Sequence, residues 1–196
     1  GLQRLRLTPK TTSGQSVVDW TMTLEGASRE AEYEDQNHNR TTLISIHPGT
    51  REVTISCNGT VATADHAGII GRHPGHLPMW HFLDQTASTR PGPRMKAMIA
   101  GLPVEDDPVT TLHRFSATIL DAVKYETGFT DADTPAEEAL AAGRGVCQDH
   151  SQIFIGGCRV MGVPARYVSG YLMMDDRIDQ EAGHGWAEAH IEGLGW

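Results

Sequence analysis

Cys147 occupies the place in this sequence best suited to a nucleophile. It follows Gly143-Arg144-Gly145-Val146, whose two glycines allow the backbone to turn sharply before a helix that begins at or next to the cysteine. The unsatisfied N–H groups in the first turn of that helix carry a partial positive charge. They favour the thiolate over the thiol and supply hydrogen-bond donors for a developing oxyanion. This pattern indicates nucleophilic catalysis by Cys147.

The other two of the three cysteines, Cys57 and Cys158, fit a structural role. A buried cysteine is usually a small hydrophobic residue of the core. In the expected helix, side chains that recur at intervals of four and three share one face: Cys147, Ser151, Phe154, Cys158 and Met161. We expect Cys158 to be buried in this stripe and Cys57 to be held in a β-rich segment. An odd number of cysteines also leaves at least one thiol free.

A thiol nucleophile needs a base, usually an imidazole, within hydrogen-bond reach. His184 stands out among the ten histidines because it opens the last expected strand, where its small neighbours Gly183 and Gly185 leave room around the ring. The period of two of a strand places His184, Trp186 and Glu188 on a polar face, with Gly185, Ala187 and Ala189 on the other. We expect the Cys147 sulfur to face the His184 ring.

A metal site competes for some of the same residues. His184 and His190, together with Asp149 or Cys147, have side chains that bind metal ions. Histidines six positions apart on a strand are too distant for one ion unless the chain bends, so this alternative is disfavoured. We therefore expect no metal and no cofactor.

The periodicity of the sequence changes along the chain. β-branched runs at 17–24, 41–46 and 53–61 predict an antiparallel sheet. Helices are expected over 94–100, over 109–124, from Pro135 to Gly143 with Thr134 as the N-cap, and from Cys147 to Gly162. Strands are expected over 165–173 and 184–191. We predict an α+β protein with a β-rich N-terminal domain over residues 1–75 and a core domain over 76–196.

Composition excludes several classes of function. Sixteen Lys and Arg against 25 Asp and Glu give a net charge of −9, which disfavours binding of a nucleic-acid phosphate backbone. No apolar stretch approaches the roughly 18 to 20 residues of a membrane span, and Gly1–Lys10 lacks the pattern of a signal peptide. We expect a cytoplasmic protein with no membrane partner, whose N-terminus is incomplete because the first residue is not Met.

Three motifs, in one order, resemble the bacterial transglutaminase-like family, a branch of the papain-like cysteine enzymes. They are Gly145-Val146-Cys147-Gln148-Asp149-His150, the run Gly162–Tyr171 and His184-Gly185-Trp186-Ala187-Glu188. The resemblance covers residues 109–196, and Leu5–Pro9 resembles the N-terminal β region that often precedes this core. It implies that a helix bearing the cysteine packs on an antiparallel sheet bearing the histidine. It also implies a Cys-His-Asp triad, with Cys147 as nucleophile and His184 as base.

The resemblance places the third triad residue, an Asp, on a strand that follows a segment such as Gly193–Trp196. We therefore expect this Asp beyond Trp196, in a sequence that is cut at both ends. Glu188 cannot replace it, because it lies about 13 Å along the strand from His184. Asp149 is rotated about 200° round the helix from Cys147, so a capping or backbone-binding role suits it better. Three further carboxylates, in a loop, are interpreted as solvated charge: Asp175, Asp176 and Asp179.

The resulting hypothesis is a thiol-dependent hydrolase or acyltransferase, either a cysteine protease or amidase or a transglutaminase-like enzyme. It would act on amide bonds of peptides or proteins through an acyl-enzyme on Cys147, which water or an amine resolves, with His184 as general base. The alternative is a non-catalytic binding or scaffolding module with an inert thiol on the same fold.

Overall fold

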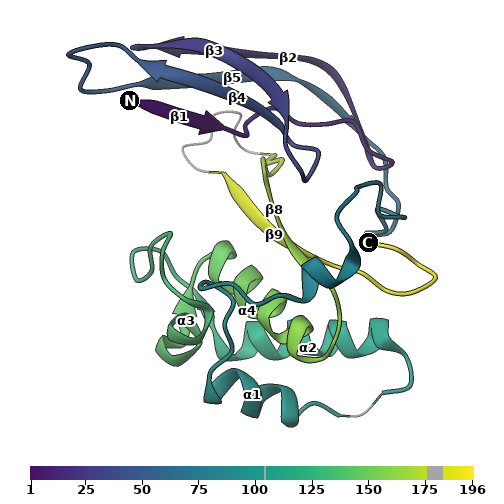
Figure 1. Cartoon of the computed structure of the whole chain (residues 1–196). Coiled ribbons are helices and arrows are strands. Elements are labelled where there is room, and N and C mark those ends of the chain that lie inside the picture. The colour runs from purple at the N-terminus through teal and green to yellow at the C-terminus, as the bar shows by residue number, and fades with distance from the viewer. Residues whose placement is uncertain (104, 176–182) are drawn as a thin grey trace. The chain divides into compact units, whose positions relative to one another are not determined.

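The computed structural model of the chain describes residues 1–103, 105–175 and 183–196 (Figure 1). These residues form two compact units. The N-terminal unit comprises Gly1–Leu77 with Gly195, and the core unit comprises Pro78–Leu194 with Trp196. The domain limits predicted from the sequence, 1–75 and 76–196, stay a prediction.

The N-terminal unit is built from antiparallel strands in two sheets, with the orders β1-β4-β3 and β2-β5. The strands are β1 (Leu2–Leu5), β2 (Gln15–Glu25), β3 (Ala27–Glu34), β4 (Arg40–Ile46) and β5 (Thr54–Thr63). Met22 of β2 and Ile44 of β4 are buried, so both sheets contribute apolar side chains to the interior of this unit. The prediction of strands at the start of the chain is confirmed.

Strand β3 was not predicted, because its sequence lacks the alternation of a half-buried strand. Only its first residue, Ala27, is buried, and the rest of the strand is charged or polar apart from Ala31 and Tyr33. Pairing with β4 sets its place instead, in a register that runs from Ala27 opposite Ile46 to Glu34 opposite Arg40. A glycine with a φ of 80°, Gly26, reverses the chain between β2 and β3.

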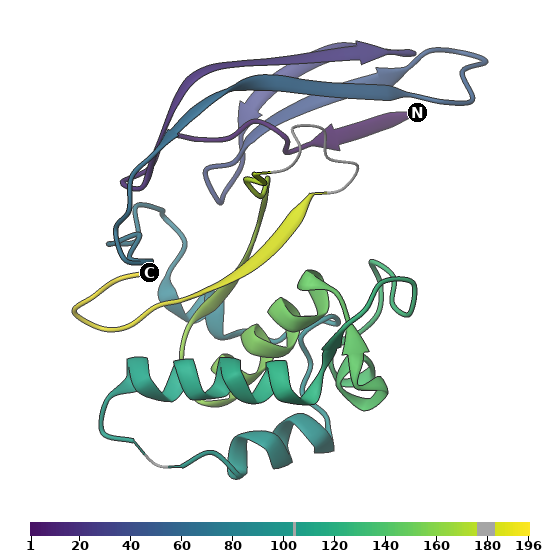
Figure 2. The ribbon, with the colours of Figure 1, turned by 180° about the vertical axis from the view of Figure 1, so that it is seen from behind.

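The core unit consists of helices packed under a β-hairpin. Its elements are η1 (Met79–Leu83), α1 (Pro93–Ala100), α2 (Pro108–Ala122), β6 (Lys124–Tyr125), α3 (Ala136–Ala142), β7 (Arg144–Gly145), α4 (Cys147–Val160), β8 (Ala165–Gly170) and β9 (His184–Ala189). The short strands β6 and β7 pair in parallel, and β8 and β9 form the antiparallel hairpin. Helix α4 contacts both strands of the hairpin as well as α1, α2 and α3. Figures 1 and 2 show α4 as a layer between the hairpin and the α1–α2 pair.

Local signals explain where two of these helices begin and end. Asp107 caps α2 by accepting hydrogen bonds from the N–H groups of Val109 and Thr110. Helix α3 ends at Gly143, as predicted, where φ is 66°. The N-cap predicted for α3 was wrong. Pro135 holds that place, because the Thr134 hydroxyl is engaged by the loop residue Asp131.

The interior of the core unit forms where α2 crosses α4. Phe115 of α2 is fully buried and stacks on Phe154 of α4, with ring centroids 5.5 Å apart. Gly157 of α4 allows this approach, since a Cβ atom there would overlap the Phe115 ring. Cys158 is also fully buried in this cluster, which confirms its predicted place in the apolar stripe.

Arg159 connects the last turn of α4 to neighbouring segments by hydrogen bonds. Its guanidinium donates hydrogen bonds to the carbonyl oxygens of Phe82 at 3.0 Å, Asp84 at 2.8 Å and Ala165 at 2.9 Å. One side chain thus ties the end of the helix to η1, to the residue that follows η1, and to the start of β8.

Candidate active site at the start of helix α4

Cys147 is the first residue of α4, as the sequence predicted, and its side chain is partly exposed. The helix starts directly after the short strand β7, which Arg144 and Gly145 form beside β6. Gly145 is needed there for space. A Cβ atom on it would lie 2.6 Å from a carboxylate oxygen of Asp149. The N–H groups in the first turn of α4 therefore lie close to the partly exposed sulfur of Cys147.

Asp149 fixes this helix start from inside the protein. Its side chain is buried, and its carboxylate accepts hydrogen bonds from the Val146 N–H and from the Thr130 hydroxyl, each at 2.7 Å. This confirms the backbone-binding role that the sequence suggested. The carboxylate thereby joins the residue before Cys147 to the loop that precedes α3.

Replacing Asp149 by alanine is expected to lower the free energy of unfolding by about 1.5–3 kcal/mol, because two donors lose a charged acceptor. Urea denaturation followed by circular dichroism measures the change. The matched control is Asp133→Ala in the exposed part of the same loop, which should stay within about 0.5 kcal/mol of the parent protein. Equal losses for the two variants would contradict this role of Asp149.

His184 is the first residue of β9, where it pairs with Gly170 of β8. Its ring contacts Trp186 edge-on, with centroids 4.6 Å apart, so the two side chains share a strand face as predicted. Ala187 and Ala189, on the other face of β9, pack against the helical core. Across residues 1–103, 105–175 and 183–196, the structure contains no hydrogen bond between the His184 ring and Cys147. The pairing of thiol and imidazole therefore stays a prediction.

Tyr167 of β8 is a residue of this site that the sequence reasoning did not single out. A Cβ atom on Gly185 would overlap its hydroxyl, so the phenol lies against the backbone directly after His184. Burial raises the pKa of the Tyr167 phenol above its ordinary value, and the negative charges of Cys147 and Asp149 raise it further. Tyr167 pairs with Ala187 in the hairpin, and no local pattern in the sequence indicates its place, because that depends on the register of the two strands.

The remaining cysteines differ from Cys147 in their surroundings. Burial raises the pKa of the Cys158 thiol far above its ordinary value. Cys57 lies on β5 of the N-terminal unit, opposite Met22, and is partly exposed. All three thiols are free, which agrees with the odd number of cysteines.

Comparison with known proteins assigns both parts of the chain. Residues 98–196 match the transglutaminase-like superfamily. Residues 1–62 match the bacterial transglutaminase-like N-terminal region. The chain belongs to the transglutaminase-like superfamily. This is a family of thiol-dependent enzymes, and the resemblance inferred from the sequence motifs is confirmed.

Relatives in sequence come from mycobacteria. An uncharacterized protein of Mycobacterium leprae is 26% identical over 204 residues, a match that covers 96% of this chain and 72% of that protein. An uncharacterized protein of Mycobacterium tuberculosis is 39% identical over 85 residues, which cover 40% of this chain and 27% of that protein.

Solved structures show the transglutaminase-like fold. The "Putative Cysteine Protease from Cytophaga hutchinsonii" has a TM-score of 0.74 at 21% identity, over 98% of this chain and 68% of that chain. The periplasmic domain of TgpA from Pseudomonas aeruginosa, bound to ethylmercury, has a TM-score of 0.53 at 15% identity, over 100% and 73% of the two chains. The α+β fold predicted from the sequence is thereby confirmed.

The acid of a transglutaminase-like triad has no counterpart among the described side chains around His184, none of which places a carboxylate on its ring. Glu188 instead forms an ion pair with Arg166, with 2.7 Å between Nη2 and Oε2. Asp176 and Asp179 lie outside the described residues.

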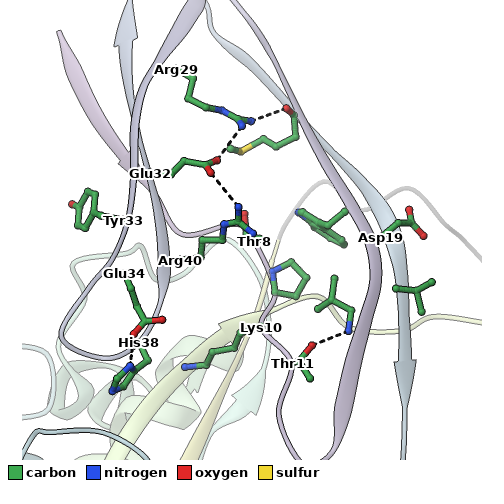
Figure 3. Close-up of a pocket in the computed structure, with 15 residues that line it drawn as sticks. Thr8, Lys10, Thr11, Asp19, Arg29, Glu32, Tyr33, Glu34, His38 and Arg40 are labelled. Carbon is green, nitrogen blue, oxygen red and sulfur yellow. Dashed lines mark hydrogen bonds and ion pairs between the residues drawn. The ribbon is translucent and has the colours of Figure 1, made fainter.

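A polar groove lies within the transglutaminase-like N-terminal region. Its volume is about 820 Å³, and Figure 3 shows its lining between β2 and β3. Glu32 bridges two of the lining cations, Arg29 at 3.0 Å and Arg40 at 3.2 Å. Glu34 pairs with His38. The described lining contains no cysteine.

Two kinds of feature are absent from the part of the chain that the structure describes. No three side chains of the His, Cys, Asp and Glu types are grouped so that they could hold a metal ion. None of the helices has both the length and the apolar character that crossing a membrane requires.

Proposed function

We propose that Cys147 is the nucleophile of an enzyme that cleaves or transfers acyl groups at amide bonds of peptides or proteins, with His184 as general base. The observation that carries the proposal is the partly exposed thiol at the first residue of α4, in the cysteine motif of a thiol-dependent family. Helix N–H groups at that position stabilise both a thiolate and the oxyanion that forms when the thiolate attacks a carbonyl group.

The reaction has two stages. His184 takes the proton of the thiol, the sulfur bonds to the carbonyl carbon, and the π electron pair moves to the oxygen. Collapse of this intermediate restores the carbonyl and breaks the C–N bond, and His184 returns the proton to the leaving amine. Water or a second amine then attacks the thioester and gives its proton to His184. Collapse of this second intermediate breaks the C–S bond, the acid or new amide leaves, and His184 returns the proton to the Cys147 sulfur. Hydrolysis and transamidation differ only in which of these nucleophiles reaches the thioester.

Iodoacetamide labelling at about pH 7 tests the proposal at the level of the thiol. We expect Cys147 to be alkylated first and Cys158 to remain unmodified, because Cys158 is buried and its thiol is held protonated. We also expect His184→Ala to slow the alkylation of Cys147 by about tenfold or more, since the thiolate loses its base. Mass spectrometry of the labelled peptides measures each rate.

The control for the histidine is His113→Ala on the exposed side of α2, which should leave the rate unchanged. Equal labelling of Cys147 and Cys57, together with no effect of His184→Ala, would favour a binding or scaffolding module with an inert thiol. The absence of a hydrogen bond between Cys147 and His184 in the described residues is the observation that keeps this second function in consideration.

A further inference from the structure

The Tyr167 hydroxyl is held close to the start of β9 by the absence of a side chain at position 185. Tyr167 lies opposite Ala187 in the hairpin, and the two residues share the strand face that packs toward α4. From there its phenol reaches along β9 to the Gly185 backbone, where a Cβ atom would overlap both the hydroxyl and the ring. The side chain is 38% exposed, so the hydroxyl is not sealed in the core.

The charges around the phenol come from the start of α4. Burial contributes most to the raised pKa of Tyr167, followed by the negative charges of Cys147 and Asp149. A phenol with a raised pKa keeps its proton throughout the neutral range. Tyr167 is therefore a hydrogen-bond donor on the hairpin face that packs toward the helices.

We propose that the Tyr167 hydroxyl is a second hydrogen-bond donor to the oxyanion formed on the Cys147 acyl intermediate. The inference rests on the proposed function of Cys147. The first-turn N–H groups of α4 supply one set of donors, and Tyr167 supplies another from the facing strand. Two donors that approach from different elements define a place for the carbonyl oxygen and hence the orientation of the substrate.

The phenol transfers no proton in this role. When the sulfur bonds to the carbonyl carbon, the π electron pair moves to the oxygen, and the phenol O–H donates a hydrogen bond to the negative charge. When the intermediate collapses, the pair returns to the C–O bond, the leaving group departs, and the phenol keeps its hydrogen.

Tyr167→Phe removes the hydroxyl and keeps the ring. The probe is p-nitrophenyl acetate with the intact protein, because its p-nitrophenolate release and the acetylated Cys147 peptide can both be measured. We expect acetylation of Cys147 to slow by about 100-fold, the scale of losing one oxyanion donor. Alkylation of Cys147 by iodoacetamide breaks a C–I bond and forms no oxyanion, so it should change by less than about twofold.

The matched control is Tyr33→Phe, which removes an exposed phenol from the N-terminal unit and should change neither rate. A second variant, Gly185→Ala, leaves the Tyr167 hydroxyl in the chain but displaces it with a methyl group. It should lower the acetylation rate as Tyr167→Phe does, and it provides the same test if the tyrosine variant is unstable.

The outcomes separate the two proposals. If the parent protein is not acetylated on Cys147, the proposed function fails. If the parent protein is acetylated and both variants match it, the function stands and the role of Tyr167 is refuted. If acetylation and alkylation fall together, Tyr167 acts on the thiol, which also refutes a donor role toward the oxyanion.

Discussion

Replacing Cys147 by serine is expected to abolish acyl transfer, with acetylation by p-nitrophenyl acetate falling more than about 1,000-fold. Serine fits the space of the cysteine at the start of α4, so the fold should be kept. Its hydroxyl is a far weaker nucleophile near neutral pH, because the alkoxide is not accessible there. Stopped-flow measurement of p-nitrophenolate release gives the rate.

Cys57→Ser is the control for this loss. Cys57 is the other partly exposed thiol, and it lies on β5 in the N-terminal unit. The variant should react like the parent protein. If Cys147→Ser retained full activity while Cys57→Ser lost it, the nucleophile would be assigned to the wrong unit of the chain.

The largest effect on stability is expected for Phe115→Ala, which should lower the free energy of unfolding by about 3–5 kcal/mol. The Phe115 side chain is fully buried, stacks on Phe154 and closes over Gly157. Truncation removes these contacts and leaves a cavity between α2 and α4 that the helices can fill only in part. Urea denaturation of the parent protein and the variant, with midpoint and slope fitted together, measures the difference in their free energies of unfolding.

Phe129→Ala provides the comparison for this second variant. The Phe129 ring is 53% exposed and lies 4.1 Å from the Arg144 guanidinium. An exposed cation–π contact contributes about 0.5–1 kcal/mol, so the loss should be several-fold smaller than for Phe115. Similar losses for the two phenylalanines would mean that the α2–α4 crossing is not the dominant core of this unit.

Elements with local signals could be predicted from the sequence. Asp107 and Pro108 begin α2, and Gly143 ends α3, because capping depends on residues close in the chain. Strands rich in β-branched residues, such as β4, were predicted for the same reason. Strand β3 was not predicted, because pairing with β4 determines its position and its own sequence has no apolar alternation.

The residues of the candidate site likewise differ in whether a local signal in the sequence indicates them. Cys147 could be predicted because a glycine-rich turn and a helix start are local, and the roles of Asp149 and Cys158 follow from helical spacing. Tyr167 could not, since its place depends on the register of β8 against β9 and on the space above Gly185. The approach of His184 to the thiol likewise depends on tertiary packing, which no spacing in the sequence determines.

Helix α4 is anchored at both of its ends, and this has a mechanical consequence. Asp149 accepts a hydrogen bond from the Thr130 hydroxyl in the loop before α3, and Arg159 donates hydrogen bonds to three carbonyl groups around the last turn. Sliding the helix along its axis by even a fraction of a turn would break hydrogen bonds at both anchors at once. Cys147 therefore stands on an element that is tied down at both ends. Under the proposed function, we expect any motion that admits a substrate or releases a product in the hairpin and the loops around the thiol rather than in α4.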